Sequence, residues 1–247
     1  MNDGATAAGG RRGDGDRTLV LAHRGAWDRA PQNSLEAVRR AAALGCDGVE
    51  IDVRRTADGR LVVVHDGRLG WRAVRRMEHR EVQARMAAGQ APLLGDVLDE
   101  AAAGGLLVDV ELKEDGYVPE AMALIARHLD GHRYVVTSFR PGVLAQVRRH
   151  HPDSRTGLLV APRTARQAPR RMHESGADVL LPHVSLVRSG IVEWAAGEGL
   201  AVWVWTVNED QALRALSADP RVAALITDAP AEALARSQGV DLADSRE

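Results

Sequence analysis

Cysteine, lysine and aromatic residues are scarce in this sequence of 247 residues. Cys46 is the only cysteine, which excludes an internal disulfide and a cysteine-based zinc site, and a cytoplasmic location is expected because thiols are kept reduced there. No apolar run approaches the roughly 20 residues needed to cross a bilayer, so no stable membrane insertion is expected. The formal net charge is only −2, without a long basic tract. Nucleic acid is therefore not expected as a partner.

The composition is otherwise that of a globular protein, with 45% hydrophobic and 27% charged residues. Lys113 is the only lysine among 32 basic residues, so a strong bias toward arginine has spared one position. Such a lone lysine is either chance or a residue whose ammonium group is needed. The sequence does not indicate an oligomeric state.

Short β-rich runs alternate with helical stretches, without a linker rich in Pro, Gly and Ser. We expect one domain over residues 18–236, after a disordered leader (1–17) and before a polar tail (237–247). Eight strands are expected, at 19–23, 48–53, 106–112, 134–138, 156–160, 179–182, 201–206 and 223–227. Strand–helix alternation predicts parallel crossovers, and the length suits a TIM (β/α)8 barrel, typically about 250 residues. An open doubly wound sheet is disfavoured because residues 22–26 lack its glycine-rich loop.

One further run, 61–65, follows the second expected strand too closely for a crossover helix. Asp58-Gly59 is a strong hairpin signal, so this run is expected to fold back antiparallel. Pairing Thr56 with Leu61 would place Asp52 opposite His65. The stretch after this run carries Arg68, Arg72, Arg75 and Arg76, which are interpreted as a solvated helix face rather than as a positive rim that attracts a phosphate-bearing head group.

Polar residues concentrate at the carboxyl ends of the first three strands and at the end of the hairpin run. They are His23, Arg24, Glu50, Asp52, His65, Asp109, Glu111 and Lys113. Barrel enzymes keep their active sites at this end of the strands. Converging carboxylates repel one another, and the usual remedies are a raised pKa or a bound cation. Oxygen ligands favour a hard cation, Mg²⁺ or Ca²⁺.

Each of these residues also has an ordinary structural interpretation: a buried histidine, a surface arginine or, for Asp109, a supporting carboxylate. Their joint placement favours a site. Two imidazoles can exchange acid and base roles, a divalent cation can polarise a phosphoryl oxygen, and Arg plus Lys can hold a phosphate. We therefore expect a phosphate diester as substrate. A serine hydrolase is disfavoured because no GxSxG motif occurs.

Ten short segments, in order over roughly residues 19–232, resemble the glycerophosphodiester phosphodiesterase family. The matching segments are His23-Arg24-Gly25, Pro31-Gln32-Asn33-Ser34, Val49-Glu50-Ile51-Asp52-Val53, Asp58-Gly59, Val64-His65-Asp66, Pro92-Leu93-Leu94, Glu111-Leu112-Lys113, Ser138-Phe139, Trp205-Thr206-Val207-Asn208 and Thr227-Asp228-Ala229-Pro230. The His-Arg-Gly, Glu-x-Asp, His-Asp and Trp-Thr-x-Asn segments are the most specific.

The resemblance implies a TIM barrel that hydrolyses glycerophosphodiesters to sn-glycerol 3-phosphate and an alcohol. It also implies a small insertion over the active site, at residues 67–90 after the second strand. It implies an acid–base pair, His23 and His65. The implied metal ligands are Glu50, Asp52 and Glu111, the implied phosphate contacts are Arg24 and Lys113, and Trp205 would pack against the glycerol. Trp203 is instead expected to fill the barrel. The resemblance also suggests that the glycerol 2-hydroxyl attacks phosphorus and that water then opens the cyclic phosphate.

Gln32 departs from the family's usual glutamate and removes one negative charge beside the expected metal site. Two rival functions remain open. One is a lysophospholipase D-like or phospholipase-like enzyme of the same superfamily, disfavoured because no exposed apolar loop is identified in the sequence. The other is a catalytically silent barrel that senses phosphorylated ligands. The favoured partner is a small soluble glycerophosphodiester.

Overall fold

The computed structural model describes residues 17–238. The expected leader and tail therefore lie almost wholly outside the described residues. Eight parallel strands form a closed barrel, because the order β1-β11-β10-β9-β8-β7-β6-β2 is completed by the pairing of β1 with β2. The strands are β1 (Leu19–His23), β2 (Gly48–Arg55), β6 (Leu107–Leu112), β7 (Tyr134–Ser138), β8 (Thr156–Val160), β9 (Val179–Pro182), β10 (Ala201–Val204) and β11 (Ala224–Thr227). The expected TIM barrel is confirmed.

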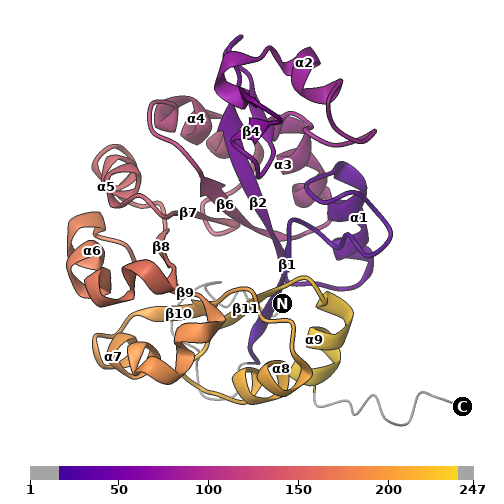
Figure 1. Cartoon of the computed structure of the whole chain (residues 1–247). Coiled ribbons are helices and arrows are strands. Elements are labelled where there is room, and N and C mark those ends of the chain that lie inside the picture. The colour runs from indigo at the N-terminus through magenta and orange to yellow at the C-terminus, as the bar shows by residue number, and fades with distance from the viewer. Residues whose placement is uncertain (1–16, 239–247) are drawn as a thin grey trace, which may run out of the picture.

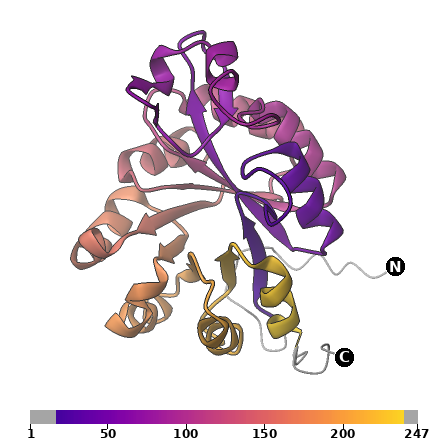
Figure 2. The ribbon, with the colours of Figure 1, turned by 45° about the vertical axis from the view of Figure 1, so that its right-hand side comes forward.

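A helix follows each barrel strand and covers the outside of the barrel (Figures 1 and 2). These helices are α1 (Leu35–Ala43), α3 (Leu94–Ala103), α4 (Val118–His128), α5 (Pro141–His150), α6 (Ala168–Ser175), α7 (Ile191–Gly197), α8 (Asp210–Ser217) and α9 (Pro230–Ser237). Two 3-10 helices, η2 (Pro162–Gln167) and η3 (Val184–Ser189), precede α6 and α7. Within residues 17–238, no helix has both the length and the apolar character to cross a membrane.

Two apolar cores hold the barrel. The larger lies between the strands and the helices, and the smaller fills the barrel interior. Trp203, on β10, is completely buried in the inner core, as expected for a barrel-filling side chain. The inner core fills the barrel interior, and the polar side chains gather at the carboxyl ends of the barrel strands.

The insertion after β2 has its own small core. It comprises β3 (Leu61–Val63), the hairpin β4 (Arg68–Leu69) and β5 (Arg72–Ala73), the 3-10 helix η1 (Val74–Arg76) and the helix α2 (His79–Gln83). Met77 and Val82 pack there against the β3 segment. The expected solvated helix face is wrong for Arg68 and Arg72, which belong to a hairpin, whereas Arg75 and Arg76 are exposed on η1. The sequence identified no exposed apolar loop, and in this insertion the structure exposes one large apolar side chain, Trp71 at the hairpin turn, which is 82% exposed.

The antiparallel pairing of β2 with β3 is confirmed, but its expected register is wrong by one residue. Arg55 pairs with Leu61, so Val64 rather than His65 follows opposite Asp52, and the Val64 N–H donates to the Asp52 carbonyl. The cause is a three-residue loop closed by Thr56 and Arg60, in which Gly59 has a φ of +78°. A three-residue hairpin with glycine in the left-handed region is a common alternative to longer loops.

The turn after β1 brings the chain close to α1. Gly25 has a φ of +81°, and a Cβ there would lie 2.6 Å from the Ala37 Cβ and 2.8 Å from its carbonyl carbon. The turn holds His23 and Arg24 beside α1, whose first turn is capped by the Ser34 hydroxyl. Only a residue without a side chain fits at Gly25.

Gly25→Ala should therefore destabilise the protein by about 3 kcal/mol or more, since left-handed strain and overpacking each cost about 1–3 kcal/mol. The matched control is Gly45→Ala, where φ is +80° but nothing lies within 4 Å of the added Cβ. That variant should lose only about 1–2 kcal/mol, the strain alone. Denaturant unfolding measures both, and equal losses would contradict the packing argument.

Candidate active site

A cavity of about 180 Å³ opens at the carboxyl ends of the barrel strands. It is lined by His23, Arg24, Glu50, His65, Asp109, Glu111, Lys113, Thr137, Phe139, Leu159, Trp205 and Ile226. All the site residues expected from the sequence line this cavity except Asp52. The Asp52 side chain is buried, with only 1% of its surface exposed. The structure thus brings together residues that are far apart in the chain.

Three carboxylates meet because β2 and β6 run parallel in a fixed register. Asp52 pairs with Glu111, and Glu50 lies two residues before Asp52 on the same face. One ligand oxygen from each lies within 4.8 Å of the others, and all three residues are buried. The three carboxylates are close enough to one another to hold a metal ion.

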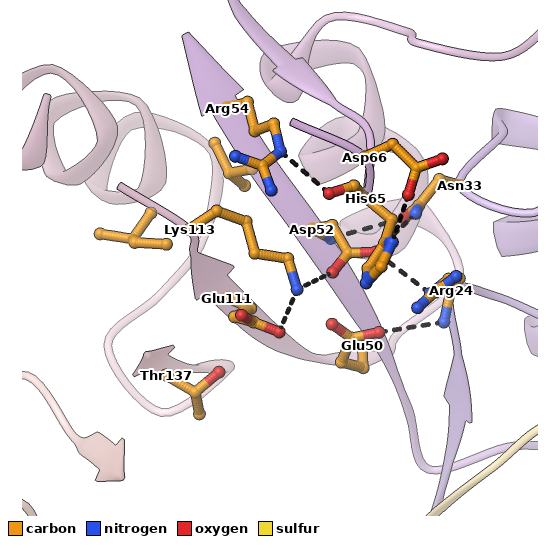
Figure 3. Close-up of polar contacts among 12 residues, drawn as sticks. Arg24, Asn33, Glu50, Asp52, Arg54, His65, Asp66, Glu111, Lys113 and Thr137 are labelled. Atoms are coloured by element: carbon orange, nitrogen blue, oxygen red, sulfur yellow. Dashed lines mark hydrogen bonds and ion pairs between the residues drawn. The ribbon is translucent and has the colours of Figure 1, made fainter. Parts of the chain in front are cut away.

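Lys113 neutralises part of this negative charge. Its Nζ lies 2.5 Å from Asp52 Oδ1 and 2.5 Å from Glu111 Oε2 (Figure 3). Burial alone would lower the pKa of Lys113, but the Glu111 and Asp52 carboxylates outweigh it and the pKa is raised. The only lysine of the sequence is therefore a charged group at the centre of the cluster.

Asp52 is the best-supported carboxylate. Besides Lys113, Arg24 Nε lies 3.2 Å from Asp52 Oδ2, and Asn33 Nδ2 donates to the same oxygen at 2.7 Å. Burial alone would raise the pKa of Asp52, but the Lys113 and Arg24 charges outweigh it and hold that pKa below its usual value. Gln32 does not face the carboxylates directly, because its Oε1 accepts from Arg24 Nη1 at 2.7 Å.

The charged forms of the other two carboxylates in the cluster, Glu50 and Glu111, are disfavoured. Burial, together with the nearby Asp52 charge, raises the pKa values of Glu50 and Glu111. Glu111 Oε1 has no hydrogen-bond partner within the described part of the chain. Three buried carboxylates, two of them with raised pKa values and one with an unpartnered oxygen, fit a hard divalent cation, which would favour their ionised forms.

The two histidines approach the cavity in similar ways. His23 Nδ1 lies 2.7 Å from Asp228 Oδ1, and its Nε2 lies 3.8 Å from Glu50 Oε2. His65 Nδ1 lies 2.8 Å from Asp66 Oδ1. Burial lowers the pKa of His65, although the Asp52 charge opposes this effect. Each ring thus uses Nδ1 on a carboxylate and keeps Nε2 for another partner.

Residues outside the sequence-based site support it. Asn33, with a φ of +54°, contacts Asp52, and Arg54 Nε donates to the His65 carbonyl at 2.9 Å (Figure 3). Asp228 directly follows β11 and contacts His23. Its position at the end of a barrel strand is the same sequence signal that identifies the polar residues of the first half of the barrel.

Trp205 lines the cavity with its ring, because its Nε1 is already used by the Leu181 carbonyl at 2.8 Å. Phe139 and His183 meet it edge to face, with ring centroids 5.4 and 5.0 Å away. These contacts fix the indole plane, so Trp205 offers a rigid apolar wall.

Asp109 is completely buried beside the cluster, and Thr137 Oγ1 donates to its Oδ1 at 2.6 Å. Burial raises its pKa from 3.8 to about 8, with further contributions from Glu111 and Asp52. The folded protein therefore binds the Asp109 proton more tightly than the unfolded chain does. The stabilisation from this proton is complete below about pH 4 and is lost as the pH rises through about 8.

Asp109→Asn should remove this dependence, since the amide resembles the protonated carboxyl. In chelator-treated protein, the free energy of unfolding of the unsubstituted chain should fall relative to the variant by about 1 kcal/mol per pH unit between about pH 4 and 8. Urea unfolding at several pH values measures the difference. Parallel curves for the two proteins would contradict a protonated Asp109.

Comparisons with known proteins agree with this architecture. Residues 23–232 match the model of the glycerophosphoryl diester phosphodiesterase family. A glycerophosphodiester phosphodiesterase of Caldanaerobacter subterraneus is 28% identical over 87% of this chain and 95% of its own length. A solved glycerophosphodiester phosphodiesterase of Parabacteroides distasonis is 25% identical, with a TM-score of 0.79 over 91% of this chain and 98% of its own.

A phosphodiesterase of Oleispira antarctica, solved in complex with the product sn-glycerol-3-phosphate, shares the fold. Its TM-score is 0.78 at 22% identity, over 90% of this chain and 97% of its own. The family match spans nearly all of the described residues, including every strand from the end of β1 to β11. The chain belongs to the glycerophosphoryl diester phosphodiesterase family and is an enzyme of that class.

Proposed function

We propose that the chain hydrolyses soluble glycerophosphodiesters to sn-glycerol 3-phosphate and an alcohol, with His23 and His65 as the acid–base pair. One observation carries the proposal: two imidazoles with Nδ1 engaged on carboxylates border the cavity that also holds Glu50, Glu111 and Lys113. The Oleispira antarctica protein of the same fold binds sn-glycerol-3-phosphate as product, which supports this product class.

Each step uses proton transfers that the two rings can perform. In the first, one imidazole takes the proton of the glycerol 2-hydroxyl as its oxygen attacks phosphorus, and the other gives a proton to the departing alcohol. In the second, water opens the cyclic phosphate and the protons return by the reverse route. Paired imidazoles suit both directions because their ordinary pKa lies near neutrality.

We further propose that Glu50, Asp52 and Glu111 hold Mg²⁺ or Ca²⁺. A divalent cation in such a site supplies Lewis-acid polarisation of a phosphoryl oxygen. Lys113 has three N–H donors, of which two are used on Asp52 and Glu111. The third is available for a phosphate oxygen. Arg24 offers a second positive charge, and the Trp205 ring offers a wall for the glycerol carbons.

A lysophospholipid is kept as a second candidate substrate because the β4–β5 hairpin exposes Trp71 among arginines. Tryptophan and arginine together favour the interface between water and lipid headgroups. A cytoplasmic location and a single domain over residues 18–236 stay predictions.

Substitution of either histidine should abolish turnover. His23→Ala and His65→Ala are each expected to lower kcat on glycerophosphocholine by about 10²- to 10⁴-fold, the usual contribution of a positioned acid or base. Enzymatic detection of glycerol 3-phosphate measures the rate, and lysophosphatidylcholine is assayed alongside. His173→Ala, on the outer helix α6, is the control and should leave the rate unchanged. Full activity in either active-site variant would refute the assigned pair, and turnover of the lysophospholipid alone would replace the substrate.

Loss of one carboxylate should weaken metal binding directly. Asp52→Asn and Glu111→Gln are expected to reduce the affinity for Mg²⁺ or Ca²⁺ by about 10- to 100-fold, comparable with changes around other metal sites. Isothermal titration calorimetry measures affinity without substrate, and chelator should abolish turnover of the unsubstituted enzyme. Glu120→Gln, on the exposed surface of α4, is the control. Unchanged affinity in both site variants would place the metal elsewhere.

A further inference from the structure

Asp228 is placed beside His23 by the seam that closes the barrel. In the pairing of β1 with β11, Ala22 lies opposite Thr227, so the next residues along the two parallel strands are His23 and Asp228. The indigo first strand and the yellow last strand lie side by side in Figure 2. The contact is therefore set by strand register, not by a mobile loop.

The Asp228 carboxylate is held from several sides. Its Oδ1 lies 2.7 Å from His23 Nδ1 and also accepts from Trp27 Nε1 at 3.3 Å. Its Oδ2 accepts from Asn208 Nδ2 at 2.7 Å. The side-chain oxygen of Asn208, Oδ1, in turn accepts from the Asp228 backbone N–H at 2.9 Å and from the Thr227 hydroxyl at 3.3 Å. These bonds define the orientation of the Asn208 amide.

An ionised carboxylate can only accept hydrogen bonds. Burial alone would raise the pKa of Asp228, but the hydrogen bond and charge of His23, with Asn208 and Trp27, lower it. Neutral His23 bonded to this carboxylate must carry its hydrogen on Nδ1. Nε2 then has the free lone pair, and it is the ring nitrogen nearest Glu50.

We propose that Asp228 is a positioning residue that fixes His23 in the Nδ1–H tautomer, and that Asn208 is the brace that orients Asp228. The inference rests on the proposed function, in which Nε2 of His23 exchanges the proton of a reacting oxygen. Asp228 touches neither substrate nor metal ligands. It acts through the imidazole, as the carboxylate does in acid–base pairs of other hydrolases.

His65 also has a carboxylate partner, Asp66, but this carboxylate is less restrained than Asp228. Asp66 also bonds to a histidine Nδ1, but its side chain is 68% exposed against 28% for Asp228. Among residues 17–238, only His65 contacts the Asp66 carboxylate. The carboxylate at His65 is thus free to turn into water, whereas the one at His23 is not. Only the His23 pair is expected to depend strongly on its carboxylate.

Asp228→Asn provides the sharpest test because Asn208 determines the orientation of the new side-chain amide. Asn208 Nδ2 donates to Oδ2 at 2.7 Å, a shorter bond than the 3.3 Å bond from Trp27 Nε1 to Oδ1, so the Asn oxygen takes the Asn208 side and its NH₂ group faces His23. Nδ1 must then accept, and the hydrogen moves to Nε2. We expect kcat to fall about 10²- to 10⁴-fold with KM within about threefold, since a wrong tautomer removes base function without removing the binding groups.

Three further measurements separate positioning from a general structural role. His23→Ala and His23→Ala/Asp228→Asn should have equal rates, because Asp228 acts only through His23. Asn208→Ala should lower kcat about tenfold while the metal affinity in calorimetry stays unchanged. Asp99→Asn is the matched control: Asp99 bonds to Nδ1 of His128 at 2.5 Å on the outer helices, and its loss should leave kcat unchanged.

The tautomer itself is read from the ¹⁵N chemical shifts of the His23 imidazole, at a pH where the ring is neutral. The unsubstituted protein should show Nδ1–H, and Asp228→Asn should show Nε2–H. Nε2–H in the unsubstituted protein, or a kcat within threefold for a folded Asp228→Asn variant, would overturn the inference. Absent turnover with an Nδ1–H signal would instead refute the proposed function and leave the tautomer assignment standing. If Asp228→Asn does not fold, the same readings on Asn208→Ala decide.

Discussion

The ion pairs of Lys113 are the interaction on which the barrel mouth depends. Buried carboxylates on neighbouring strands repel one another, and a charge removed from water is costly unless it is paired. Lys113 binds the two that face each other across β2 and β6, while Arg24 and Asn33 satisfy the far side of Asp52. The mouth can therefore concentrate acidic groups that would otherwise open the barrel to water.

This arrangement also explains why the acidic residues differ in their properties. Asp52 keeps its charge because Lys113 and Arg24 lie beside it, whereas Asp109 holds a proton because burial raises its pKa more than the Thr137 hydrogen bond lowers it. Burial also raises the pKa values of Glu50 and Glu111, so a cation bound beside them would favour their charged forms. Carboxylates on two neighbouring strands thus differ in their affinity for a proton because their surroundings differ.

Much of the architecture was predictable because strand period and helix alternation are local properties of the sequence. The barrel, the polar ends of its first strands and the filling role of Trp203 follow from those patterns. The hairpin register failed because loop length depends on whether Thr56 closes on Arg60 or pairs one residue further along. Asp228 was missed for a different reason. Its partner is distant in sequence, and the contact exists only when the first and last barrel strands pair.

The pairing of the first strand, β1, with the last, β11, has a consequence for folding during synthesis. The hydrogen bond from His23 to Asp228 joins residues 205 positions apart, and β1 pairs with β11 along its length. Contacts of such sequence separation form late, since a long loop must close before they contribute. During synthesis, the residues of the acidic cluster and both histidines belong to the first half of the chain to be made. The chain nevertheless lacks the carboxylate that orients one of them until its last strand arrives. If Asp228 positions His23 as proposed, full acid–base function is a property of the completed barrel only.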